Sequence, residues 1–111
     1  MKTFIVPLLA ALAATALWAP AANAAPAAAT VHIKNFAFVP ARLSVPAGTS
    51  VTFVNDDQEP HTATAVDHAF DSDAIDTNGT WSHTFAQPGS YAYFCEMHPY
   101  MKGTIVVTVP K

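Results

Sequence analysis

Short runs of alternating apolar and polar residues cover the chain from Val31 onward. Alternation with a period of two is typical of β-strands that bury one face, and the run from Val31 to Phe36 is a clear example. No stretch in this part shows the helical period of about 3.6 residues over a useful length. Turn-forming residues separate the runs, as in Pro46-Ala47-Gly48-Thr49. About seven short strands with turns between them predict an all-β, antiparallel sandwich.

The strands are expected where the alternation and the β-forming residues are strongest. Their ranges are 31–36, 43–45, 51–55, 62–66, 81–85, 91–95 and 103–109. The polar and acidic stretch 67–79 is expected to be a loop with little regular structure. The inward-facing residues predict one modest core, made of Ile33, Phe36, Phe38, Leu43, Val45, Val51, Phe53, Trp81, Phe85, Tyr91, Ile105 and Val107.

The N-terminal part of the chain has a different pattern. A lysine precedes the apolar run Phe4–Trp18, and Ala22-Asn23-Ala24 is a small-x-small cleavage pattern. This arrangement predicts a secretory signal peptide over residues 1–24 and export to the periplasm. The alternative is an uncleaved membrane anchor, but a bilayer span usually needs about 20 apolar residues and this run is shorter. Residues 25–30 are then expected to be a flexible lead-in to a single domain over residues 31–111.

The charge balance excludes one class of partner. The chain has 5 Lys and Arg residues against 8 Asp and Glu, a formal net charge of −3. Nucleic-acid binding needs a basic surface, so this balance argues against nucleic acid as a partner. The sequence shows no glycine-rich phosphate loop, no Ser-His-Asp pattern and no dedicated catalytic acid, base or nucleophile. We therefore expect no enzymatic activity.

The segment Cys95-Glu96-Met97-His98-Pro99-Tyr100-Met101 concentrates side chains that bind soft metals. Cys95 is the only cysteine, and an odd cysteine in an exported protein indicates a reactive thiol, an intermolecular disulfide or a metal ligand. A buried, inert cysteine is the alternative. The placement of His98 and Met101 at three-residue intervals favours the metal ligand. With His61 upstream, the set is one thiolate, two imidazoles and a thioether, which is the ligand set of a blue copper centre.

Two methionines compete for the thioether position. Met97 lies between Cys95 and His98, where its side chain should point away from a metal that both residues hold. Met101 follows the turn and can fold back over the metal, so Met101 is the expected weak axial ligand. The remaining histidines are expected on strand faces or in loops; they are His32, His68 and His83.

Two further segments carry a family resemblance. Phe38–Asn55 reads as a strand, a Gly-Thr turn and a strand, and Gly89–Cys95 leads into the ligand loop. With the ligand pattern, they resemble the cupredoxin family of blue copper proteins, the amicyanins most closely, with plastocyanin and pseudoazurin as relatives. The resemblance implies a Greek-key sandwich of about seven to eight strands. It also implies one type 1 copper ion, alternating between Cu(I) and Cu(II), whose ligands are His61, Cys95, His98 and Met101.

Two positions depart from the family pattern. Thr62 follows the first histidine where the family commonly has asparagine, whose side chain ties the two ligand loops together. We expect Thr62 to replace that hydrogen bond in part. Met97 stands where amicyanins have proline, so it keeps a backbone N–H. That N–H is expected to donate to the Cys95 sulfur.

These features predict a soluble, monomeric carrier of one electron between protein redox partners, with no membrane association after signal cleavage. The donor would be a dehydrogenase or a cytochrome, and the acceptor a cytochrome or an oxidase. Met97, Pro99 and Tyr100 are expected to form an apolar patch around His98, and the carboxylates on both sides of His61 to attract a basic partner. Periplasmic copper handling is the alternative function, and a structural sandwich that has lost its metal is a third.

Overall fold

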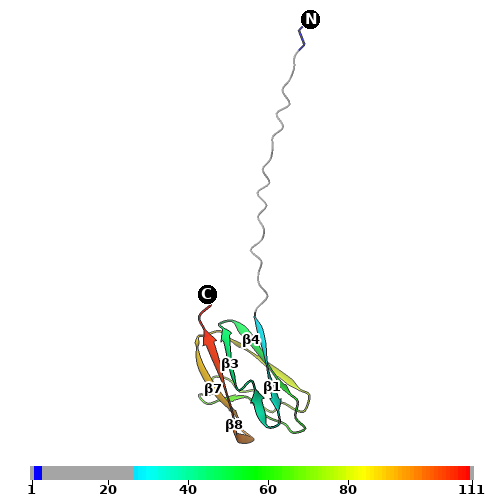
Figure 1. Ribbon diagram of the computed structural model, residues 1–111, viewed down its shortest axis with the longest axis vertical. Helices are drawn as coiled ribbons and strands as arrows, with labels where there is room; N and C mark the ends of the chain where they lie inside the picture. Colours follow the sequence, from blue (N-terminus) through cyan, green and yellow to red (C-terminus); the bar gives the residue numbers. More distant parts are fainter. Residues whose placement is uncertain (1, 4–26, 111) are drawn as a thin grey trace.

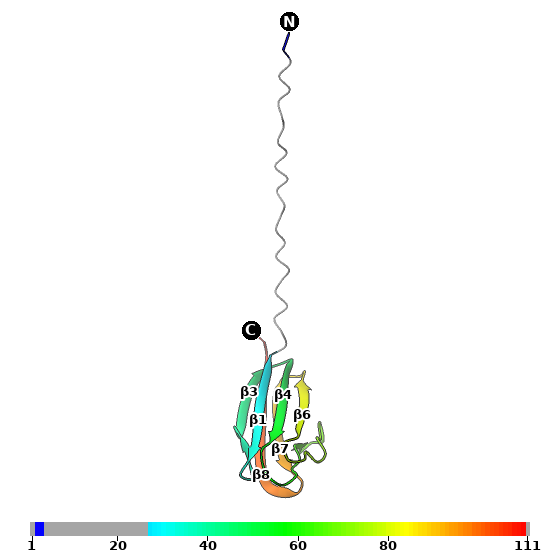
Figure 2. The same ribbon diagram turned by 90° about the vertical axis from the view of Figure 1, so that its right-hand side faces the viewer.

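The computed structural model describes residues 2–3 and 27–110, so the expected signal peptide over 1–24 lies almost entirely outside the described residues. No helix in the described part is long and apolar enough to cross a membrane. The described chain forms eight strands in two four-stranded sheets, which are seen as two layers in Figures 1 and 2. The prediction of an all-β sandwich is confirmed.

Each sheet combines parallel and antiparallel pairs. The first sheet has the order β2 (Ala37–Val39), β1 (Ala28–Lys34), β4 (Thr49–Asn55) and β6 (Thr80–Phe85). The second has the order β3 (Arg42–Pro46), β8 (His98–Thr108), β7 (Gly89–Cys95) and β5 (Thr64–Ala65). Strand β1 runs parallel to β4, and β3 runs parallel to β8. Alternation of side chains reports which face is buried but not strand direction, so these two parallel pairs were not expected from the pattern.

Strand β1 begins at Ala28, inside the segment 25–30 for which the sequence predicts a flexible lead-in. From Ala28 it pairs in continuous register with β4, and the Ser50 N–H donates to the Ala27 carbonyl at 3.0 Å. The hydrogen bonds between paired strands come from the backbone, so a segment of small side chains can extend a strand. Such a segment shows no alternation of apolar and polar residues by which the strand could be predicted. The lead-in prediction is therefore wrong for residues 28–30.

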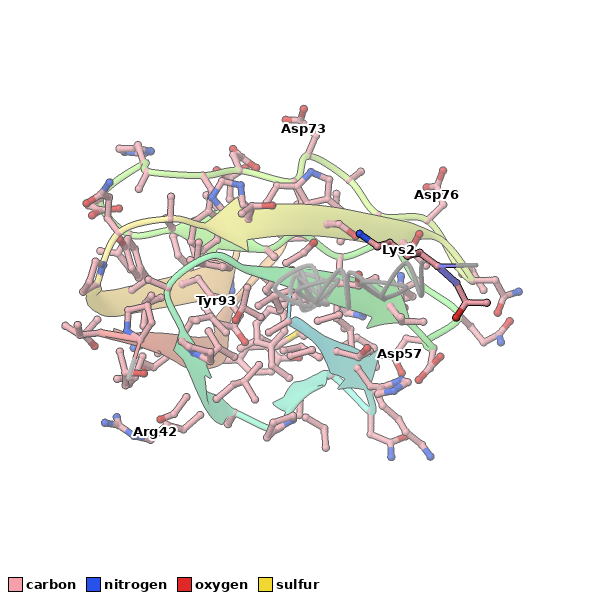
Figure 3. All side chains as sticks on the ribbon, turned by 90° about the horizontal axis from the view of Figure 1, so that it is seen from above. Lys2, Arg42, Asp57, Asp73, Asp76 and Tyr93 are labelled. Carbon is pink, nitrogen blue, oxygen red and sulfur yellow. The ribbon has the colours of Figure 1, made fainter. Side chains whose placement is uncertain are left out.

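The core lies between the two sheets, and Tyr93 of β7 is at its middle (Figure 3). Most predicted core residues are buried: Ile33, Phe38, Val45, Val51, Phe53, Phe85, Ile105 and Val107. Three more pack against the core while partly buried: Leu43, Trp81 and Tyr91. The prediction is wrong for Phe36, which is 39 % exposed. Phe36 lies in the turn after β1, not in the strand.

The acidic stretch 67–79 contributes to the core as well as to the surface. Phe70 and Ile75 are buried within it, and neither was in the predicted core. Ile75 exchanges two backbone hydrogen bonds with His61, at 2.7 and 3.2 Å. Asp73 and Asp76 project away from the sandwich (Figure 3). The stretch is irregular, as expected, but it fixes the backbone of His61.

Candidate metal centre

The β7–β8 connection brings two candidate ligands together. Strand β7 ends at Cys95, two turn residues follow, and β8 begins at His98, which pairs directly with Cys95. The next pair is Phe94 with Lys102, so residues 99–101 are additional residues on β8. A bulge of this kind bends a strand and changes the direction of its side chains. The local sequence thus places Cys95 and His98 side by side at one end of the sandwich.

His61 completes a compact group of donor atoms. The Cys95 Sγ lies 3.7 Å from His61 Nδ1 and 3.7 Å from His98 Nδ1. One donor atom from each of the three residues lies within 4.8 Å of the others. Cys95 and His61 have no exposed surface, whereas the His98 side chain is 22 % exposed. Of the residues that the structure describes, these three alone form such a group.

The two methionines differ sharply in burial. Met101 is buried in β8, with 2 % of its surface exposed, whereas Met97 in the turn is 47 % exposed. A buried thioether three residues beyond His98 is shielded from water. An exposed one in the turn faces water. The burial therefore favours Met101 over Met97 as a fourth donor.

The chemistry of this donor group fits copper. Metal–nitrogen and metal–sulfur bonds of about 2.0–2.3 Å are compatible with donor atoms 3.7 Å apart around one ion. Thiolate and thioether donors favour copper over hard cations such as magnesium or calcium, and imidazole suits both copper oxidation states. The group buries a cysteine whose thiol pairs with no other cysteine. Cys95, His61 and His98 are thus the residues that would hold a copper ion, with Met101 beside them in sequence.

Thr62 ties the two ligand segments together. Its backbone N–H donates to Cys95 Sγ at 3.3 Å, and its hydroxyl accepts a hydrogen bond from the Glu96 N–H at 2.9 Å. The expected replacement of the family's asparagine by Thr62 is therefore observed. The hydrogen bond expected from the backbone N–H of Met97 to Cys95 Sγ is not formed in the described part of the chain. The N–H that donates to this sulfur belongs to Thr62. The turn directs Met97 outward, whereas Thr62 approaches the sulfur from the neighbouring segment.

Asp57 holds His61 from the side opposite the donor group. With His61 Nδ1 turned toward Cys95, Nε2 carries the proton and donates to Asp57 Oδ2 at 2.9 Å. The same carboxylate accepts the backbone N–H groups of Asn35 and Phe36. Burial alone would raise the pKa of the Asp57 carboxyl group, but the hydrogen bonds from Phe36, Asn35 and His61 outweigh it and lower that pKa. A partner that fixes the tautomer also orients the ring for metal binding.

Sequence reasoning did not identify the roles of Asp57 and Phe36. Asp57 reads as one of several surface carboxylates before His61, and Phe36 reads as the last inward residue of a strand. The Phe36 ring instead meets both imidazoles edge to face, with centroids 5.4 Å from His61 and 5.2 Å from His98. The one available signal was the carboxylate four residues before a candidate ligand histidine.

The exposed side of the group is partly apolar. Tyr100 is 68 % exposed, its ring meets that of His98 at 6.2 Å, and Met97 and Pro99 are exposed beside it. Glu59 Oε2 lies 3.5 Å from His98 Nε2. Of the three donor residues, His98 is thus the one that reaches the surface. It does so beside Met97, Pro99 and Tyr100, the residues expected to surround it.

The other histidines lie outside the donor group. His32 on β1 pairs with Asp56 at 2.7 Å, and His68 is exposed in the irregular stretch. His83 on β6 stacks on Trp81, with ring planes 13° apart. Burial lowers the pKa of His83, which favours its neutral form. Their placement on strands and in a loop is as predicted.

Known proteins resemble this chain in both sequence and fold. The family model of the cupredoxin-like domain matches residues 7–107. Amicyanin-alpha of Methylorubrum extorquens is 38 % identical over 104 residues, which covers 88 % of this chain and 86 % of that protein. A purple cupredoxin from Nitrosopumilus maritimus has a TM-score of 0.68 at 30 % identity, over 72 % of this chain and 99 % of the other.

A solved structure of an amicyanin mutant with Cu(I) has a TM-score of 0.69 at 29 % identity, over 73 % of this chain and 82 % of the other. The family model spans most of the chain, including every candidate ligand. The relatives share its sequence pattern over most of their length, and the solved structures share its two-sheet fold. On this sequence match and on the fold and donor group described above, the chain belongs to the cupredoxin family.

Proposed function

We propose that this protein is a carrier of single electrons that binds one type 1 copper ion through His61, Cys95, His98 and Met101. The observation that carries the proposal is the approach of both imidazole Nδ1 atoms to 3.7 Å from one buried cysteine sulfur. The likeness to amicyanins supports it. When bound, copper supplies a couple between Cu(I) and Cu(II), and the protein's residues set how readily it exchanges electrons.

Residues outside the ligand loop hold the donor atoms in place. Asp57 fixes the ring of His61, and Thr62 fixes the sulfur of Cys95. Buried groups that are already positioned change little when the charge of a bound ion changes, which keeps the reorganisation energy of electron transfer low. A four-ligand set leaves no open position for a substrate, so we propose no enzymatic activity.

We propose that electrons pass through His98, because its ring is the exposed member of the donor group. Met97, Pro99 and Tyr100 would form the contact surface for a redox protein, a dehydrogenase or cytochrome as donor and a cytochrome or oxidase as acceptor. A monomer exported to the periplasm, with a signal peptide over residues 1–24, fits this role. The relatives named amicyanin support this placement by analogy alone.

Copper handling is the alternative function, and electron-exchange kinetics distinguish the two. The copper-loaded protein should give a reversible one-electron voltammogram and a fast self-exchange rate, measured by NMR line broadening in mixtures of both oxidation states. A protein that only carries copper does not need rapid electron exchange, because its redox chemistry is incidental. Irreversible voltammetry, or slow exchange with copper fully bound, would favour copper handling over electron transfer.

A further inference from the structure

The turn between β1 and β2 is strained at a residue that this turn type does not favour. Lys34 pairs with Ala37, so Asn35 and Phe36 form a two-residue hairpin turn, and both have positive φ values, 52° and 56°. Two-residue turns with positive φ at both positions favour Asn-Gly. Asn35 suits the first position, but Phe36 stands where glycine is preferred. A bulky residue with positive φ costs about 1–2 kcal/mol, so another interaction must favour phenylalanine here.

The ring of Phe36 provides that interaction. It meets the rings of both His61 and His98 edge to face. Phe36 itself is 39 % exposed, while His61, directly beneath it, has no exposed surface. Phe36 therefore lies between solvent and the buried part of the donor group. We call this ring the aromatic cover.

Asp57 holds the aromatic cover in place. Its Oδ1 accepts the Asn35 N–H at 2.7 Å, and its Oδ2 accepts the Phe36 N–H at 2.9 Å. The same Oδ2 accepts the Nε2–H of His61 at 2.9 Å. Hydrogen bonds to an ionised acceptor are roughly twice as strong as neutral ones, so they can offset the strain of the turn. The side chain of Asp57, 11 % exposed, lies close to the end of β1 (Figure 3).

We propose that the aromatic cover closes the approach from solvent to the donor group, and that Asp57 is the positioning residue that keeps it closed. One carboxylate binds both the turn that carries the cover and the ligand beneath it. The position of the cover is thereby tied to that of His61. Exclusion of water and small solutes from Cys95 then depends on a strained turn remote in sequence from every candidate ligand.

The accessibility of Cys95 to a thiol reagent tests this proposal. Because Cys95 is the only cysteine, reaction of the metal-free, full-length protein with iodoacetamide reports the exposure of this one side chain. Phe36→Gly removes the ring and suits the turn, whereas Phe36→Tyr keeps the ring. We expect labelling to accelerate roughly tenfold or more in Phe36→Gly, a decrease of about 1.4 kcal/mol in the free energy of opening, and to be unchanged in Phe36→Tyr.

Global unfolding is measured separately by denaturation of each metal-free variant. An acceleration in Phe36→Gly that is fully explained by lower global stability would overturn the proposal. Labelling at the wild-type rate would overturn it too. Neither result depends on which metal the site binds, so failure here leaves the copper proposal standing, and failure of the copper proposal leaves this experiment valid.

A double-mutant cycle isolates the role of Asp57. Asp57→Asn keeps one carbonyl oxygen but cannot accept all three hydrogen bonds, so labelling should accelerate in this variant. If Asp57 acts through the cover, the same substitution should add little in the Phe36→Gly background. Equal acceleration in both backgrounds would show that Asp57 acts on His61 alone and would overturn its assignment as the residue that holds the cover.

Discussion

At the residue scale, the candidate metal centre is fixed by hydrogen bonds from outside the ligand loop. Cys95 receives the Thr62 N–H, and His61 donates to Asp57. The first contact joins segments 33 residues apart in sequence, whereas the second is local, but the same Asp57 carboxylate also accepts the N–H groups of Asn35 and Phe36 from a distant turn. The donor atoms are thus positioned by the tertiary fold, and changes at Thr62 or Asp57 should alter the centre without removing a ligand.

Thr62→Val tests the link between the two ligand segments. Valine has nearly the shape of threonine but leaves the Glu96 N–H without its acceptor. We expect the free energy of unfolding of the metal-free protein to fall by about 1–2 kcal/mol, as for other lost hydrogen bonds of partly buried groups. Thr62→Ser keeps the hydroxyl and is the matched control. Equal stability of the valine and serine variants in urea denaturation would contradict the assignment.

Met101→Leu tests the choice of axial donor. Loss of a thioether donor disfavours Cu(II) relative to Cu(I), so the reduction potential of the copper-loaded protein should rise. We expect the potential to rise by about 60 mV or more. For a one-electron couple, this corresponds to a tenfold change in the ratio of the site's affinities for Cu(I) and Cu(II). Met97→Leu, at an exposed position, should leave the potential and the visible spectrum unchanged. A large shift from Met97→Leu, with none from Met101→Leu, would reverse the assignment.

At the scale of elements, the β7–β8 pair that presents Cys95 and His98 depends on one close contact. Tyr93 is paired with Gly103 across the two strands. A methyl group added at Gly103 would lie 2.2 Å from Tyr93 Cζ. The Tyr93 hydroxyl is buried without a hydrogen-bond partner among the described groups, and burial raises the pKa of Tyr93. The ring fills the core above the glycine, while its buried hydroxyl without a partner lowers the stability of the fold.

Opposite effects are therefore expected from two substitutions in this pair. Gly103→Ala should lower the free energy of unfolding by about 3 kcal/mol, because a fully buried ring cannot move away from the new methyl group. Tyr93→Phe should raise it by about 1 kcal/mol, because it removes a buried hydroxyl that has no partner. Calorimetry of both variants measures the two effects. A destabilised Tyr93→Phe would mean that the hydroxyl has a partner after all.

Sequence pattern predicted the elements better than it predicted their connections. The inward faces of the predicted strands could be located from alternation, and the pair of Cys95 and His98 from its three-residue spacing, because both depend on residues close in sequence. His61 lies 34 residues before Cys95, and it was included because it completes the ligand set that the family resemblance implies. The parallel pairing of β1 with β4 could not be predicted from the pattern, since it arises from backbone ladders. The contacts of Phe36 and Asp57 depend on a turn with positive φ values, which the Asn-Phe sequence does not favour.

At the scale of the whole molecule, the surface around His98 combines a carboxylate with an apolar side chain, because Glu59 Oε2 lies 3.5 Å from His98 Nε2 and the Tyr100 ring meets the His98 ring. The carboxylates are not equivalent. Asp57 is engaged by three hydrogen bonds, and Asp56 pairs with His32. The other exposed carboxylates are Glu59, Asp67, Asp71, Asp73, Asp76 and Glu96. These six are the groups available to attract a basic partner, while Met97, Pro99 and Tyr100 would make the close contact.

The salt dependence of association tests whether the carboxylates attract the partner while the apolar residues make the contact. If the exposed carboxylates steer a basic redox partner, the bimolecular rate of electron transfer should fall steeply with ionic strength, since screening acts over about 8–10 Å at ordinary salt. Asp73→Asn with Asp76→Asn should weaken that dependence. Stopped-flow kinetics with a basic cytochrome measures both. A rate that is flat or rises with salt would exclude acidic steering and leave the apolar surface as the contact.

The visible spectrum of the protein loaded with Cu(II) tests the central claim most directly. A thiolate bound to Cu(II) with two imidazoles gives an intense charge-transfer band and a blue to green or purple colour. We expect this band in the wild type, at one copper per chain, and its loss in Cys95→Ser while the far-UV circular dichroism of the sandwich is retained. A colourless wild type, fully loaded with Cu(II), would contradict the proposed copper centre and the electron-carrier function built on it.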